Sequence, residues 1–86
     1  MSGQSKLPPQ LTWKKFVCVL EALGYEMMKS KRGSARSFYS KNRQPSVVTF
    51  HEPHGKDAIR DGTLREYIRK LQITREQFLE ILKSCS

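Results

Sequence analysis

The spacing of the hydrophobic residues changes twice along the chain, from helical to extended and back to helical. In the first region they recur at intervals of three and four, which places them on one face of a helix over residues 12–23. Thr12 is suited to be the N-cap of this helix, and Gly24 is suited to take a left-handed conformation after its last turn. The members of the apolar face are Trp13, Phe16, Val17, Leu20 and Leu23.

The middle of the chain has the composition of three short strands joined by polar turns. Residues 46–51 are rich in β-branched and aromatic side chains and give the strongest strand signal. Residues 25–30 and 35–40 are the two other expected strands, separated from each other by a turn at 31–34 that contains Gly33. Short connections of this kind predict an antiparallel meander.

Helical spacing returns after an expected loop at residues 52–62. Thr63 and Glu66 have the spacing of a capping box, and Thr74 and Gln77 repeat that spacing farther on. These caps predict one helix and then a second, short C-terminal helix. The hydrophobic residues that follow them are Leu64, Tyr67, Ile68, Leu71, Phe78, Leu79 and Leu82.

The expected fold is α+β, with the order α-β-β-β-α, a three-stranded antiparallel meander, helices on one face of the sheet and an extra short C-terminal helix. Residues 1–10 are rich in Ser, Gln and Pro and are interpreted as a flexible lead-in, and residues 11–86 as a single domain. A domain of 86 residues has too small an interior for a deep cofactor cavity, so no cofactor is expected.

The charge points to anionic partners. Sixteen Lys and Arg against eight Asp and Glu give a formal net charge of +8, which favours nucleic acid, an acidic protein or a membrane surface. No apolar run approaches the roughly 20 residues of a spanning helix, and the polar start lacks the pattern of a signal peptide. We therefore expect a cytoplasmic protein without membrane contact. Cys18 and Cys85 are interpreted as free thiols, with one disulfide left open.

Basic residues are concentrated in the predicted meander. Six cations lie between residues 29 and 43 with no acid among them, a composition suited to phosphate binding, although a solvated face is the alternative. Arg65 and Arg69 are four residues apart and share a face of the next helix. A DNA-binding domain is disfavoured because no recognition helix follows a helix-turn-helix pattern. The six cations are Lys29, Lys31, Arg32, Arg36, Lys41 and Arg43.

Two histidines are candidates for proton transfer. RNA cleavage without a metal requires a base for the 2′-hydroxyl and an acid for the leaving oxygen, and histidine titrates in the suitable range. His51 is placed at a strand end and His54 in the following loop, close to Lys56. The alternative is that both histidines only shape the strand end and the turn. No Cys/His spacing or carboxylate cluster indicates a metal site.

Several motifs, spread over residues 12–83, together resemble the HicA family of toxins. The resemblance implies a fold like the double-stranded RNA-binding domain and metal-independent endoribonuclease activity on mRNA. It also implies a type II toxin–antitoxin pair in which a HicB-type antitoxin neutralises the toxin. The motifs are Leu23-Gly24-Tyr25, Lys31-Arg32-Gly33-Ser34, His54-Gly55-Lys56-Asp57, Gly62-Thr63-Leu64-Arg65 and Ile73-Thr74-Arg75-Glu76-Gln77-Phe78-Leu79.

Ala35 departs from the family pattern, because members usually carry a catalytic histidine at this position, directly after the Gly-Ser of the turn. Three explanations stay open. His54, with His51 in reserve, carries the proton chemistry; or the chain is an inactive relative that binds RNA or protein; or Ala35 is an engineered substitution. In the first, Lys56 offsets transition-state charge. The expected RNA contacts are Lys31, Arg32, Gly33, Ser34, Arg36, Lys41, Lys56, Arg65 and Arg69.

Overall fold

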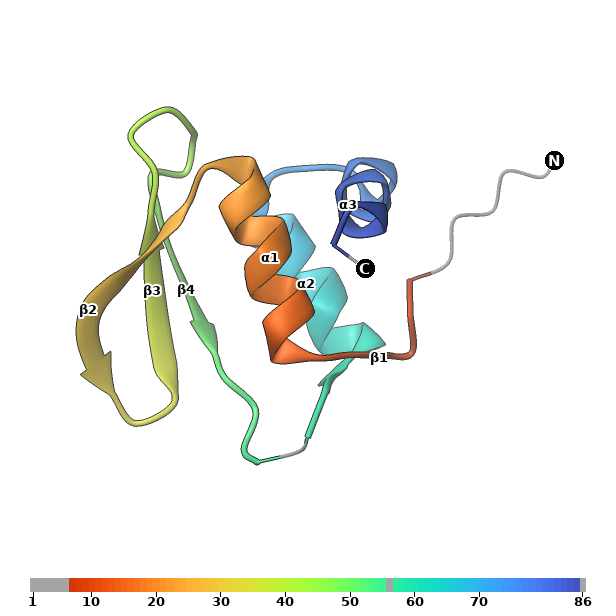
Figure 1. Ribbon diagram of the computed structural model, residues 1–86, viewed down its shortest axis with the longest axis horizontal. Coiled ribbons are helices and arrows are strands. Elements are labelled where there is room, and N and C mark those ends of the chain that lie inside the picture. Colours follow the sequence, from red (N-terminus) through yellow and green to blue (C-terminus); the bar gives the residue numbers. More distant parts are fainter. Residues whose placement is uncertain (1–6, 56, 86) are drawn as a thin grey trace, which may run out of the picture.

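The chain folds as an α+β domain in which a three-stranded antiparallel sheet packs against helices on one of its faces (Figure 1). The structure, a computed structural model, describes residues 7–55 and 57–85, with the backbone alone at residues 30–32. The predicted order α-β-β-β-α with an additional C-terminal helix is confirmed. In chain order the elements are β1 (Gln10–Leu11), α1 (Trp13–Leu23), β2 (Glu26–Arg32), β3 (Ala35–Tyr39), β4 (Val47–His51), β5 (Ile59–Arg60), α2 (Asp61–Leu71) and α3 (Arg75–Lys83).

The ends of α1 are those expected from its sequence. The Thr12 side chain accepts a hydrogen bond from the Lys15 backbone N–H at 3.2 Å, which satisfies one of the free donors of the first turn. Gly24 ends the helix at φ 102°, a conformation that side chains with a Cβ rarely adopt. Local chemistry at both ends therefore sets the length of α1.

The sheet has the order β2-β3-β4, so the predicted meander is confirmed. β2 continues to Arg32, two residues beyond the predicted end of the first strand, because the turn to β3 occupies only Gly33 and Ser34. Gly33 supplies the positive φ (56°) that so tight a turn needs. β3 and β4 pair in continuous register, from Ala35 with His51 to Tyr39 with Val47.

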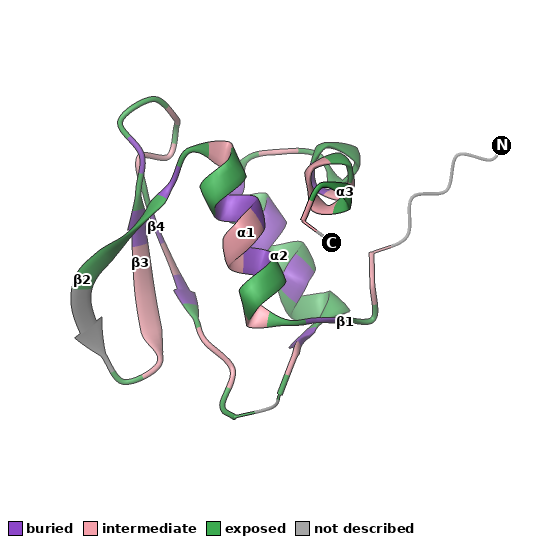
Figure 2. Cartoon of the chain, in the orientation of Figure 1, coloured by how far each residue is buried: buried purple, intermediate pink, exposed green. Residues whose placement is uncertain are grey.

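The core lies between the sheet and the helices and is largely aromatic. Phe16 of α1 is fully buried, with its ring centroid 5.0 Å from that of Phe50 on β4 and 5.4 Å from that of Tyr67 on α2. Figure 2 shows buried segments where α1 and α2 lie side by side. Burial of each such ring contributes about 1.5–3 kcal/mol, so these contacts hold α1 and α2 against β4.

The start of α2 differs from the prediction. The helix begins at Asp61, so Thr63 lies inside the first turn and the expected capping box of Thr63 and Glu66 is wrong. The expected loop at 52–62 also contains β5, whose Ile59 pairs with Leu11 of β1. This pairing buries both side chains, and it brings the chain to α2 in an extended conformation. The capping box of Thr74 and Gln77 at α3 is confirmed.

Residues 7–10, the end of the expected lead-in, are described by the structure. The lead-in was expected over residues 1–10, but Gln10 lies in β1 and pairs with Arg60. Leu7 is partly buried and packs against the core. Residues 1–6 lie outside the described part of the chain, so the prediction is not tested there.

Cys18 of α1 and Cys85, just after α3, form a disulfide, so the interpretation of both as free thiols is wrong. Their Cα atoms are 6.0 Å apart, within the usual range for a disulfide. The sequence separation of 67 residues hid this proximity, which arises because α3 packs against α1. The bond links α1 to the chain just after α3.

Candidate functional site

Ala35 and His51 are directly opposite each other on β3 and β4. The residues on either side of this pair carry the ladder hydrogen bonds, because the Glu52 N–H donates to the Ser34 carbonyl at 2.8 Å and the register alternates. Ala35 and His51 are thus a non-hydrogen-bonded pair, in which side chains on the same face approach each other most closely. His51 therefore lies beside Ala35, the position at which the sequence resemblance implies a histidine.

His51 is held through its ring and its backbone. Its Nδ1 lies 3.3 Å from the hydroxyl of Ser34, which lies in the turn between β2 and β3. The Tyr67 hydroxyl accepts a hydrogen bond from the His51 N–H and donates one to the His51 carbonyl, both at 3.2 Å. These backbone groups point to the free edge of β4, so α2 fixes the strand end while the exposed imidazole stays accessible to solvent.

Arg36 stabilises the turn next to these residues. Its Nε lies 3.0 Å from Oε1 of Glu52, and its Nη1 donates to the carbonyl oxygens of Gly33 at 2.8 Å and Ala35 at 3.0 Å. The side chain is 18% exposed. A guanidinium has five N–H groups, so Nη2 still has donors available for a phosphate. Arg36 therefore combines a structural role with a capacity to bind anions.

His54 lines a pocket of about 480 Å³ at the end of the sheet where the turn between β2 and β3 lies. His54 is exposed, and the loop is closed by a hydrogen bond from the Asp57 N–H to the His54 carbonyl at 2.9 Å. Ser34, which contacts His51, also lines this pocket, so both histidines border the same turn. The lining residues are Gly33, Ser34, Arg36, Glu52, Pro53, His54 and Gly55. We call these lining residues, together with His51 and its backbone partner Tyr67, the turn site.

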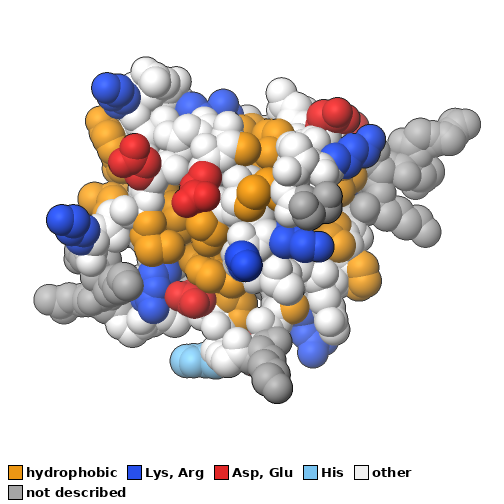
Figure 3. All heavy atoms as spheres, in the orientation of Figure 1, with side chains coloured by type: hydrophobic (Ala, Val, Ile, Leu, Met, Phe, Trp, Pro, Cys, Tyr) orange, Lys and Arg blue, Asp and Glu red, His pale blue; other side chains and the backbone are white. Residues whose placement is uncertain are grey.

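The other predicted RNA contacts lie elsewhere. Arg65 and Arg69 line a separate hollow with Leu7, and Lys41 is exposed in the loop at the opposite end of the sheet. On the face drawn in Figure 3, Lys and Arg occupy several separate places rather than one continuous patch. Lys56 and the side chains of Lys31 and Arg32 lie outside the described residues. The structure therefore divides the predicted contacts among three places.

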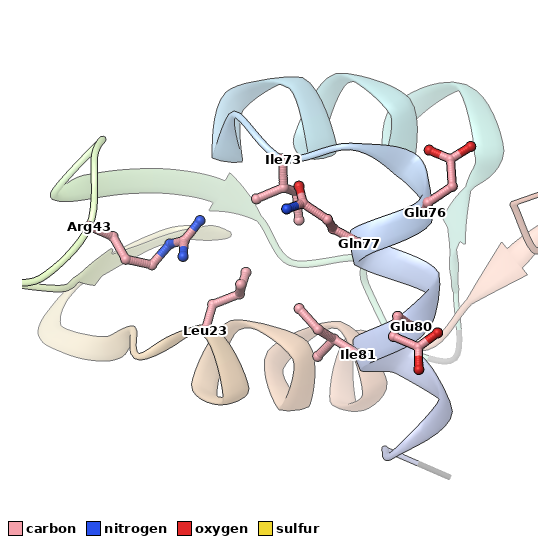
Figure 4. A pocket seen from close by; sticks show the side chains of 7 residues that line it. All are labelled: Leu23, Arg43, Ile73, Glu76, Gln77, Glu80 and Ile81. Carbon is pink, nitrogen blue, oxygen red and sulfur yellow. The ribbon is translucent and has the colours of Figure 1, made fainter.

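A groove of about 450 Å³ between α1, α3 and the β3–β4 loop has a different character (Figure 4). Leu23 and the isoleucines of the groove give it an apolar floor, and Arg43 reaches toward it from the loop. Glu76 and Glu80 lie on its α3 side. The two carboxylates would repel phosphates, so this groove is not the candidate nucleic-acid site.

Two residues of the turn site were missed by reasoning from the sequence. Tyr67 was assigned only to an apolar stripe, and Glu52 to an undivided loop. Tyr67 is 8% exposed, and its hydroxyl forms hydrogen bonds with the backbone of His51, 16 residues away. Glu52 forms an ion pair with Arg36 of β3. Neither contact has a local sequence signal, because each depends on how the β4 end lies against other elements.

The described residues contain no group of three or more His, Cys, Asp or Glu that could hold a metal ion. In the same part of the chain, no helix has the length and apolar character needed to cross a membrane.

Comparison with known families identifies the chain. The family model for the HicA toxin of bacterial toxin–antitoxin systems matches residues 13–73, more than two thirds of the sequence. The chain belongs to the HicA toxin family. Membership makes it the toxin of a toxin–antitoxin system and implies an antitoxin partner. No curated protein and no solved structure matches the chain.

The HicA match covers α1, the whole sheet and α2, and therefore the entire turn site. Ala35 is thus a departure within a recognisable HicA domain and not a sign of a different fold. In this HicA toxin the residue directly opposite Ala35 on β4 is a histidine, His51.

Proposed function

We propose that this HicA toxin is a cytoplasmic, metal-independent mRNA endoribonuclease that uses His51 and His54 at the turn site and is neutralised by a HicB-type antitoxin. The observation that carries the proposal is the pairing of His51 with Ala35 across β3 and β4. A histidine on the neighbouring strand presents its imidazole at nearly the same place on the open sheet face. The chemistry can therefore persist although position 35 is alanine.

The proposed reaction needs two proton transfers and no other reactant. The ribose 2′-hydroxyl gives its proton to one imidazole while its oxygen forms a bond to the adjacent phosphorus. The bond between phosphorus and the 5′-oxygen breaks, and that oxygen takes a proton from the second imidazole. The products are a 2′,3′-cyclic phosphate and a 5′-hydroxyl, and histidine is suited to both transfers near neutral pH.

The surroundings of the histidines support this assignment. Ser34 lies 3.3 Å from Nδ1 of His51 and can orient the ring, and Tyr67 fixes the backbone that carries it. The Nη2 of Arg36 is the proposed donor to the scissile phosphate, because Nε and Nη1 have protein partners. Lys56 is proposed to offset the charge of the transition state. More distant phosphates are proposed to contact Lys31, Arg32, Lys41, Arg65 and Arg69.

The decisive experiment is incubation of purified toxin with end-labelled mRNA in EDTA, followed by analysis of the fragment ends. We expect 2′,3′-cyclic phosphate ends and 5′-hydroxyl ends. His51→Ala and His54→Ala should each slow cleavage by about 10²-fold or more, the usual contribution of a general acid or base. Glu21→Ala, an exposed position on α1, is the matched control and should cleave like the wild type.

Cleavage that persists in the His51→Ala/His54→Ala double variant would exclude these proton carriers. Loss of cleavage on addition of EDTA would instead exclude a metal-independent reaction. Both results can be read only if the variants fold, so each protein is first compared with the wild type by circular dichroism and by its unfolding midpoint.

A second candidate function is favoured by Ala35 itself: a catalytically inactive relative that binds RNA or protein. It predicts that the wild type retards mRNA on a native gel and leaves it intact. The antitoxin part of the main proposal is tested separately by co-expression with a HicB-type protein. Co-purification and relief of toxicity support it, and toxicity that is unchanged despite expression of the partner contradicts it.

A further inference from the structure

The helices cover only one face of the sheet and leave the other face open (Figure 1). Tyr39 of β3 is an exposed aromatic residue. Its neighbour Phe38 is fully buried against the helices, and successive side chains of a strand point to opposite faces. Tyr39 is 46% exposed and lies opposite Glu26 on β2 and Val47 on β4. The ring is therefore presented to solvent between an acid and an apolar side chain.

A hollow of about 330 Å³ lies beside this ring, at the lower end of the roughly 300–1,000 Å³ typical of small-molecule sites. Its wall in the β3–β4 loop is ordered by Ser40, which is buried and whose hydroxyl accepts a hydrogen bond from the Asn42 N–H at 3.3 Å. The lining combines an aromatic face, a carboxylate, an amide and an ammonium group. The lining residues are Gly24, Glu26, Tyr39, Ser40, Lys41 and Asn42.

We propose that this hollow binds one base of a single-stranded RNA, with guanine preferred. The base stacks on Tyr39, Glu26 accepts hydrogen bonds from its edge, and Lys41 contacts an adjacent phosphate. Stacking on an aromatic side chain combined with a nearby cation is the usual means of holding unpaired nucleotides. The inference rests on the proposed action on RNA and adds a site that recognises a base.

The carboxylate of Glu26 selects the base. An ionised carboxylate only accepts hydrogen bonds, through two oxygens side by side. Guanine presents two adjacent donors, N1–H and the N2 amino group, whereas uracil presents one donor between two carbonyl oxygens. Adenine and cytosine place an acceptor nitrogen next to their amino group. Guanine is therefore the base that pairs with both oxygens of Glu26 without repulsion.

The hollow and His51 share the open face of the sheet. Three non-hydrogen-bonded pairs follow one another along β3 and β4, from Tyr39 with Val47, through Ser37 with Thr49, to Ala35 with His51. The hydroxyls of the middle pair are 2.8 Å apart, as expected for side chains on the same face. Tyr39 and Ala35 are four residues apart on one strand.

Four residues of extended strand span about 13 Å. Such a span corresponds to about four stacked nucleotides, and to fewer where the RNA strand is extended. A guanine in the hollow would thus lie a few nucleotides from the bond that is cleaved.

RNA is a better candidate for this face than a protein partner. The chain carries a net charge of +8, and the face runs without interruption to the proposed catalytic histidine. A protein partner would use the exposed apolar side chains at Val47 and Met28, which are 49% and 40% exposed. Contact with these apolar side chains would give no role to the carboxylate of Glu26 in the hollow.

The test measures binding of short 2′-O-methyl oligonucleotides by fluorescence anisotropy at fixed salt. These probes lack the 2′-hydroxyl and cannot be cleaved, so binding is separated from catalysis. Each probe is uridine-rich with a single guanine, inosine or adenine. Inosine lacks the N2 amino group, and we expect it to bind about tenfold more weakly than guanine, because one hydrogen bond to a charged group is lost.

The variants are chosen so that the proposal and general electrostatics predict opposite changes in RNA binding. Glu26→Gln removes a negative charge, which by itself strengthens nonspecific binding of RNA. We expect this variant instead to bind the guanine probe more weakly than the wild type does, and to bind the guanine and inosine probes equally. Glu21→Gln makes the same charge change on α1 and should not weaken the guanine probe. Tyr39→Leu should lower the affinity for all probes about tenfold or more. Tyr39→Phe should bind the probes as tightly as the wild type does.

Equal binding of guanine and inosine by the wild type would overturn the proposal, as would unchanged binding by Tyr39→Leu. If either result occurs while the wild type still cleaves mRNA in EDTA, the proposed ribonuclease function is retained and the proposed base-binding site is rejected. A guanine preference without cleavage would leave the base site standing and remove the catalytic proposal. Normal RNA binding by Tyr39→Leu combined with loss of antitoxin binding would assign the face to the protein partner.

Discussion

Ala35 and His51 occupy the same face of neighbouring strands as a non-hydrogen-bonded pair, with Cβ atoms about 5 Å apart in such pairs. An imidazole attached at either position reaches much the same region above the turn between β2 and β3. The proposed catalytic position of this HicA toxin is therefore a pair of facing positions and not a single residue.

This relationship predicts a rescue. His51→Ala should slow RNA cleavage about 10²-fold or more, and Ala35→His added to that variant should restore a large part of the lost rate, because the imidazole returns to the same face. The measurement is the rate of cleavage of a labelled mRNA in EDTA. A double variant no faster than His51→Ala, with its fold intact, would show that the two positions are not equivalent.

Tyr67→Phe should lower the free energy of unfolding by about 1–2 kcal/mol, because both polar groups of the His51 backbone lose their partner. Urea unfolding measures this change. Hydrogen exchange should also show faster exchange of the His51 amide, with the amides between β3 and β4 unaffected. Tyr39→Phe removes a hydroxyl from an exposed residue and should change stability by less than about 0.5 kcal/mol. Equal effects of the two substitutions would contradict the assigned role of Tyr67.

The Arg36–Glu52 pair should show a measurable coupling. The two side chains are 18% and 36% exposed, so solvent screening limits the pair to about 1 kcal/mol. A double-mutant cycle with Arg36→Ala and Glu52→Ala gives this coupling from unfolding free energies. The pair of Lys83 and Glu80, at 3.8 Å and with both side chains highly exposed, is the control and should give less than about 0.5 kcal/mol. A coupling near zero for Arg36 and Glu52 would show that the ion pair does not stabilise the turn.

Breaking the disulfide between Cys18 and Cys85 should destabilise the fold. Closure of a loop of 67 residues corresponds to about 4 kcal/mol in the chain-entropy model, relative to the unclosed chain. Cys85→Ser should therefore lower the free energy of unfolding of the oxidised protein by about this amount. Under a reducing agent the variant and the wild type should unfold together. A difference that persists under reduction would assign the effect to packing at Cys85 and not to the covalent link.

The sequence by itself determined the elements whose causes are local. Thr12 and Gly24 mark the ends of α1, and Thr74 with Gln77 marks the start of α3, because capping and positive φ depend on residues a few positions apart. The short polar turns between three strand-like segments also predicted the meander, and the family motifs predicted the HicA assignment. The turn at Gly33 and Ser34 was placed within the correct region for the same reason.

Only the tertiary structure decided the features that depend on distant parts of the chain. The pairing of Leu11 with Ile59 changed the start of α2, and the packing of α3 on α1 brought Cys18 to Cys85. The candidate site also depends on contacts between distant parts of the chain. Strand register places a residue opposite a partner far along the chain, so the position of His51 beside Ala35 could not be read from either residue's neighbours.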